Sequence, residues 1–86
     1  MGQVPADRLM AELDISIREH VGPVGRLVLR KKWRDLGIGE APIGDQQAGS
    51  LIDQLNSALS IIMGDEGATA ATARLRERAL ELGLDV

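Results

Sequence analysis

The sequence predicts an all-α fold, a compact bundle of four helices, on the strength of three observations. The chain has 86 residues, enough for one domain, residues 1–86, with a small core. Its apolar residues are Leu, Ile, Val, Ala and Met, with one Trp and no Phe or Tyr. Strands favour aromatic and β-branched side chains, so this set suits close-packed helices better. The apolar residues recur every three or four positions in four segments, which Gly and Pro separate.

The first helix is expected at about residues 5–21. Pro5 stands where a first helical residue is favourable, because its fixed φ fits a helix start. Leu9, Leu13 and Ile17 then recur every four residues, which is the pattern of an amphipathic helix. Gly22 and Pro23 follow, so we expect the first helix to end there.

The second helix is expected at about residues 23–36. Pro23 can open it, and Gly37 can end it in a left-handed conformation with Ile38 folding back onto the last turn. The stretch GIGEAPIG, which begins at Gly37, holds three glycines and one proline. We expect this stretch to be a loop.

The third and fourth helices are expected at about residues 45–63 and 66–82. Asp45 is a plausible N-cap for the third helix, and Gly64 is expected to stop it. The apolar positions of the third helix are Ala48, Leu51, Ile52, Leu55, Ala58, Leu59 and Ile62. Those of the fourth are Ala68, Ala71, Leu75, Ala79 and Leu82. Gly83 and Leu84 then repeat the ending of Gly37 and Ile38.

Charge is unevenly distributed along the chain. The formal net charge is −3, yet residues 22–36 hold five basic residues and one acidic residue, so the rest carries −7. An acidic body with one basic segment has a field that can steer it toward an anionic partner.

The basic residues gather on one side of the second helix. On a helical wheel with 100° per residue, Arg26, Arg30 and Arg34 form a ridge along the second helix. Lys31 lies in the same half of the helix circumference. Trp33 and Lys32 fall in the apolar half. One interpretation is a solvated face, or a face paired with acidic residues of the other helices. The other is a surface for an external partner, which would explain like charges four residues apart.

We therefore expect a non-enzymatic protein–protein interaction or regulatory module that docks through the second helix. Its expected partner is an acidic protein surface, which would meet Arg26, Arg30 and Arg34. Trp and Arg residues come first as candidates, because these two types dominate binding hot spots. The partner-binding residues are expected to be Arg26, Arg30, Lys31, Lys32, Trp33 and Arg34. Trp33 could instead be a core residue, and the chain could form a homodimer. The alternative function is a nucleic-acid-binding helical domain that uses the same basic helix.

No enzyme chemistry is expected. The chain has no cysteine and one histidine, His20, which argues against thiolate or histidine metal sites. We expect no catalytic residue, no cofactor and no metal. His20 is expected to bond the last carbonyls of the first helix, and Ser50 to lie in the first turn of the third. No run reaches the roughly 18 apolar residues of a membrane span, so a cytoplasmic protein without membrane contact is expected.

The stretch EHVGPVGRLVLRKKWRDLG resembles a pattern in small helical domains of unknown function attached to bacterial signalling proteins, including some Ser/Thr kinases. The matching positions are Val21, Gly22, Pro23, Val24, Gly25, Arg26, Val28 and Arg30. The resemblance covers about a quarter of the chain. It implies a regulatory or interaction module without catalysis and names no partner.

Overall fold

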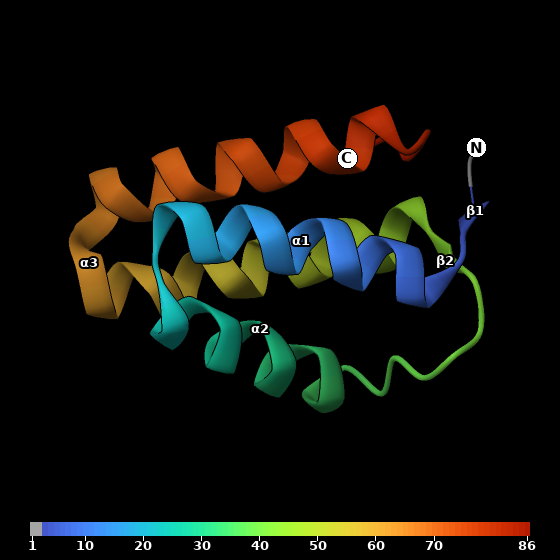
Figure 1. Cartoon of the computed structure of the whole chain (residues 1–86), viewed down its shortest axis with the longest axis horizontal. Helices are drawn as coiled ribbons and strands as arrows, with labels where there is room; N and C mark the ends of the chain where they lie inside the picture. The colour runs from blue at the N-terminus through green and yellow to red at the C-terminus, as the bar shows by residue number, and fades with distance from the viewer. Residues whose placement is uncertain (1–2) are drawn as a thin grey trace.

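A computed structural model describes residues 3–86, and residues 1 and 2 of the expected domain lie outside the described part. The structure is mostly helical, which confirms the all-α prediction (Figure 1). In chain order the elements are β1 (Gln3–Val4), α1 (Ala6–His20), α2 (Pro23–Asp35), β2 (Ile43–Gly44) and α3 (Asp45–Glu81). The helices begin and end within one or two residues of the predicted boundaries, except where the third and fourth were expected to separate.

The expectation of four separate helices is wrong, because the described chain has three and the third is sharply bent. Gly64 has φ 80° and ψ 167°, which is not helical, yet the helix resumes at once without a loop. We call residues 45–63 the first arm and residues 65–81 the second arm. Asp53 pairs with Arg76 at 2.7 Å and Asn56 contacts Thr72. These pairs are placed symmetrically about Gly64, so the arms run antiparallel (Figure 1).

The glycine endings have the geometry that the sequence predicts. Gly37 has φ 68°, and the amide of Ile38 donates to the carbonyl of Trp33 at 3.2 Å. Gly83 has φ 100°, and the amide of Leu84 likewise donates a hydrogen bond to a carbonyl in the last turn of α3. A β-carbon is strained at positive φ, so glycine is the residue that allows these turns. Each turn carries its apolar residue, Ile38 or Leu84, back into the core.

The two short strands were not predicted from the sequence. β1 and β2 pair antiparallel, with Gln3 opposite Gly44 and Val4 opposite Ile43. Both Val4 and Ile43 are buried. The pairing ties the start of the chain to the end of the 38–44 loop, so it closes the core at that end of the molecule.

Asp45 is not the N-cap of α3. It is the first helical residue, Gly44 precedes it in an extended conformation, and no side chain caps the helix start. The Asp45 carboxylate instead accepts a hydrogen bond of 2.9 Å from the amide of Asp85. A carboxylate in the first turn interacts favourably with the helix dipole. Through its hydrogen bond to Asp85, the Asp45 carboxylate also holds the C-terminal residues against the start of α3.

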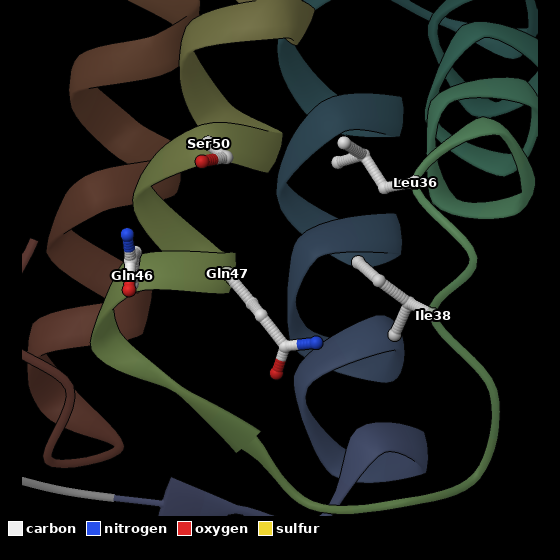
Figure 2. A pocket seen from close by; sticks show the side chains of 5 residues that line it. All are labelled: Leu36, Ile38, Gln46, Gln47 and Ser50. Atoms are coloured by element: carbon white, nitrogen blue, oxygen red, sulfur yellow. The ribbon is translucent and has the colours of Figure 1, made fainter.

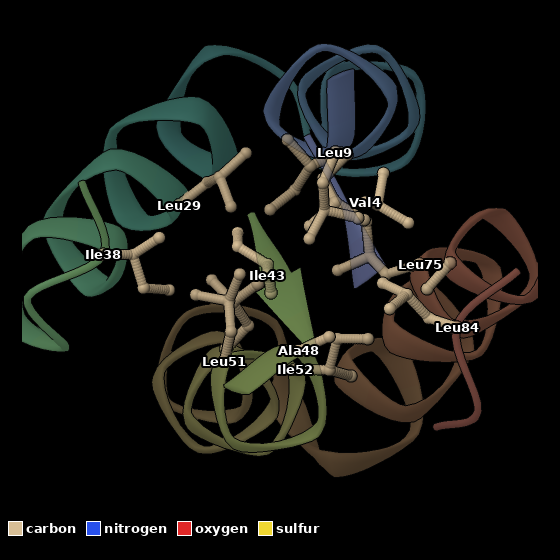
Figure 3. Packing of buried hydrophobic residues seen from close by; sticks show 14 of the residues in the cluster. Val4, Leu9, Leu29, Ile38, Ile43, Ala48, Leu51, Ile52, Leu75 and Leu84 are labelled. Atoms are coloured by element: carbon tan, nitrogen blue, oxygen red, sulfur yellow. The ribbon is translucent and has the colours of Figure 1, made fainter. Parts of the chain in front are cut away.

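One core lies between the helices, and Figure 3 shows side chains from every element meeting in it. Its fully buried large side chains are Leu9, Leu13, Ile17, Leu29, Ile43, Leu51, Ile52, Leu55, Leu59, Leu75 and Leu84. Ile62, which was expected on the apolar face of the third helix, is 51% exposed instead, and Val24 at the start of α2 is 50% exposed. The bend of α3 projects past the ends of α1 and α2 (Figure 1), so the last turn of the first arm reaches beyond its neighbours.

Candidate partner-binding surface

One side of α2 packs into the protein and the other faces solvent. Leu29 is fully buried, whereas Leu27 is 69% exposed. Arg30, Lys31 and Arg34 are exposed on the same side as Leu27. The periodicity of the sequence therefore predicted the outward ridge correctly for Arg30, Lys31 and Arg34.

Gly25 sets how closely α2 approaches the end of α1. A β-carbon built on Gly25 would lie 2.8 Å from Cβ of Val21 and 2.9 Å from Cγ1 of Ile17. Real β-carbons do not sit that close to other carbon atoms, so a larger residue would push the helices apart. Gly25 therefore permits a close approach of α2 to the end of α1.

Arg26 turns its Nε toward α1, although its side chain as a whole is 43% exposed. Its Nε lies 3.2 Å from Oδ1 of Asp14 on α1, and both atoms are buried. The two atoms lack hydrogen-bond geometry, so the contact is an ion pair without a directional bond. Asp14 also lies 3.5 Å from Arg18. Asp14 thus neutralises one of the cations that the sequence suggested for a partner.

Lys31 is paired within α2. Its Nζ donates to Oδ2 of Asp35 at 3.1 Å, one helical turn further on. This hydrogen bond, aided by the nearby positive charges, holds the pKa of the Asp35 carboxyl below its usual range. Both side chains are exposed, so the pair can open when another anion approaches.

Arg30 and Arg34 have no ion pair with any residue in 3–86. Both are exposed, and they stand one helical turn apart. Lys32 is half-buried and likewise has no carboxylate partner in that range. The ridge is therefore divided: Arg26 and Lys31 are neutralised internally, whereas Arg30 and Arg34 keep their charges available.

Trp33 is half-buried and packs against the core. It also lines a shallow hollow of about 460 Å³ on the outside of α2. That hollow is bounded by Met10, Leu27, Arg30, Lys31, Trp33 and Arg34, which we call the α2 surface. Trp33 therefore contributes both to the core and to this surface, and the two interpretations of its role are not exclusive.

Two members of the α2 surface were missed from the sequence. Leu27 is the single apolar residue within the basic half of the helix, and that isolation was the available signal. Met10 comes from α1. Its participation depends on how α1 and α2 cross, which periodicity within one helix does not give.

A hollow at the start of α3 is lined by no ionisable side chain of residues 3–86. Figure 2 shows Leu36 and Ile38 on one side of a hollow of about 260 Å³ and the first turns of α3, with Gln46, Gln47 and Ser50, on the other. None of these five side chains ionises near neutral pH, so the hollow offers no acid–base pair.

His20 has the structural contact expected of it. Its Nδ1 lies 2.8 Å from the carbonyl oxygen of Ser16 in the last turn of α1. The ring also borders a polar hollow of about 390 Å³, with Glu19, Arg74 and Glu77 among its lining residues. Among the described residues, no group of three or more histidine and carboxylate side chains is arranged to hold a metal ion.

Comparisons with known proteins leave the geometry as the guide to function. No family model, curated protein or solved structure matches the chain. The resemblance of residues 21–30 to helical domains of signalling proteins therefore stays a prediction. None of the helices in residues 3–86 is both long enough and apolar enough to cross a bilayer.

Proposed function

We propose that the chain is a non-enzymatic protein-interaction module that binds an acidic protein surface through the α2 surface. The observation that carries this proposal is the arrangement of Arg30 and Arg34. They stand exposed and without an ion pair in residues 3–86, beside the exposed Leu27. Cations next to an exposed apolar side chain suit a partner that presents carboxylates around an apolar residue.

Several features support a protein partner over a nucleic acid. Phosphate-backbone binding draws its affinity from many cations, and two candidates are already held by Asp14 and Asp35. The chain as a whole is acidic, with a pI of about 5.0. The resemblance to domains attached to bacterial signalling proteins fits a regulatory role in the cytoplasm, which we include in the proposal.

The test is photo-crosslinking with a benzophenone amino acid at position 27, an exposed member of the α2 surface. The full chain is irradiated in a lysate of the source organism, and adducts are resolved by mass. We expect a nuclease-resistant protein adduct that disappears in the variant Arg30→Ser/Arg34→Ser. The matched control, Arg8→Ser/Arg74→Ser, removes the same charge elsewhere and is expected to keep the adduct.

Two outcomes would overturn the proposal. An adduct that nuclease digestion removes would assign the surface to nucleic acid. Protein adducts that form equally with Arg30→Ser/Arg34→Ser would show that the arginines do not select the partner. Circular dichroism of each variant confirms that a lost adduct reflects a lost surface rather than a lost fold.

A further inference from the structure

The bend of α3 carries a second unusual patch, which we call the bend patch: Ile61, Ile62, Asp65 and Glu66. Ile61 is 87% exposed, the highest value among the large exposed hydrophobic residues described, and Ile62 is 51% exposed. Asp65 and Glu66 are exposed. Neither carboxylate has an ion pair or side-chain hydrogen bond within residues 3–86.

A structural role accounts for only half of the bend patch. Asp65 and Glu66 stand in the first turn after the break at Gly64, where negative charge favours the helix dipole. The helix dipole does not explain why two adjacent isoleucine side chains are exposed to solvent. An apolar residue rimmed by charges on a protruding corner is typical of a binding surface.

The bend patch and the α2 surface are opposite in charge and alike in apolar character. The bend patch presents Ile61 beside two unpaired carboxylates. The α2 surface presents a hollow of about 460 Å³ between Leu27 and Trp33, beside two unpaired guanidinium groups. The hollow has room for a branched aliphatic side chain, and the cations at its rim would meet carboxylates that flank that side chain.

We propose that the bend patch of one molecule docks on the α2 surface of a second copy of this chain. Ile61 occupies the hollow beside Leu27 and Trp33, and Asp65 and Glu66 face Arg30 and Arg34. This inference rests on the proposed function, because it names a second copy as the source of the acidic surface.

The two patches lie on different parts of the molecule, so the contact is head-to-tail. The bend is at one end of the long axis, whereas α2, which carries most of the α2 surface, runs along one side of the molecule (Figure 1). Each docked molecule keeps one unused patch, so a head-to-tail contact propagates unless rotation closes a ring. The pairing of exposed charges makes the assembly sensitive to salt.

Sedimentation velocity of the purified full chain tests the proposal, from about 10 µM to about 1 mM, a range that covers weak association. We expect the average mass to rise with concentration past that of a dimer at low salt, and to fall as salt is added. Two variants each remove one patch: Arg30→Ser/Arg34→Ser on α2 and Ile61→Ser/Glu66→Gln at the bend. Each alone is expected to weaken association by at least about tenfold, as loss of a hot spot does.

Mixing the two variants gives the sharpest result. The first keeps its bend patch and the second keeps its α2 surface, so together they can form a single contact. We expect the 1:1 mixture to form a heterodimer and nothing larger. The matched control Glu19→Gln/Asp85→Asn changes exposed acids outside the bend and is expected to assemble like the unaltered chain.

The proposal is overturned if the chain stays monomeric throughout the range, if assembly stops at a symmetric dimer, or if the mixture does not pair. The failure of this inference is distinct from that of the proposed function. A chain that is monomeric when pure, yet forms arginine-dependent crosslinks to another protein in lysate, would retain the proposed function with a different partner.

Discussion

Within residues 3–86, Asp14 is the carboxylate that forms an ion pair between α1 and the basic helix α2. Its side chain is 15% exposed and faces Arg26 and Arg18. We expect Asp14→Asn to lower the free energy of unfolding by about 1–2 kcal/mol, because it leaves a buried guanidinium atom without its anion. Urea denaturation measures this change.

A matched control comes from Asp53, whose side chain is 73% exposed although it pairs with Arg76 at 2.7 Å. Solvent screens an exposed pair, so Asp53→Asn is expected to cost less than about 0.5 kcal/mol. Equal costs for the two substitutions would mean that burial does not strengthen the contact between Asp14 and Arg26.

Lys31 controls the titration of Asp35. Since the Lys31 hydrogen bond is the main cause of the lowered pKa of Asp35, Lys31→Gln is expected to raise that pKa toward its usual range. A carboxyl whose pKa is lower when folded stabilises the protein above its unfolded pKa. That contribution disappears as the pH falls through the folded pKa.

The carboxyl carbon shift of Asp35 against pH, followed by NMR, reports this change. Lys32→Gln serves as the control, because Lys32 acts on Asp35 only through its charge and makes no hydrogen bond to it. A larger pKa change with Lys32→Gln than with Lys31→Gln would contradict the assignment.

The residue-level features differ in how far sequence alone could predict them. The outward positions of Arg30 and Arg34 follow from helical periodicity, because that property belongs to a single helix. The contact of Arg26 with Asp14 depends on the crossing of α1 and α2, which come close to each other at Gly25. Two helices must be placed in space before that pair exists, so no spacing rule in the sequence reveals it.

Among the elements, α3 depends most on one backbone conformation. Gly64 has φ 80°, where a β-carbon is strained. We expect Gly64→Ala to destabilise the fold by about 1–2 kcal/mol. The change is measured as a lower urea midpoint with an unchanged slope.

Gly49 provides the matched control within the same helix. It lies inside the first arm with helical geometry, and a β-carbon built on it would meet nothing within 4 Å. Gly49→Ala is expected to stabilise the chain by up to about 1 kcal/mol, since alanine favours a helix interior. A destabilising effect of Gly49→Ala, or a neutral effect of Gly64→Ala, would contradict this account of the bend.

The sequence predicted the position of that break but not its form. Gly64 interrupts the apolar pattern, which is why the break could be found. Whether a loop or a bend follows depends on contacts between the arms, such as those of Asp53 and Asn56. The pairing of β1 with β2 was missed for a related reason: each strand has two residues, too few for any alternation to be visible.

At the scale of the whole molecule, one core joins every element. Ile43 is fully buried in it although it lies in a two-residue strand at the end of a loop (Figure 3). Ile43→Ala is expected to reduce the free energy of unfolding by about 2–4 kcal/mol, as the loss of a buried aliphatic side chain does. Chemical denaturation of the two proteins gives the difference.

A shared core also predicts that the elements unfold together. Trp33 is the only aromatic residue, so its fluorescence reports α2, whereas circular dichroism reports all three helices. We expect both signals of the Ile43→Ala variant to change at the same urea concentration, because a small domain with one core unfolds in a single cooperative step. If fluorescence changed first, α2 would separate while α1 and α3 stayed folded. The α2 surface would then lose its hollow before the domain itself unfolds, since Met10 belongs to α1 and Trp33 to α2.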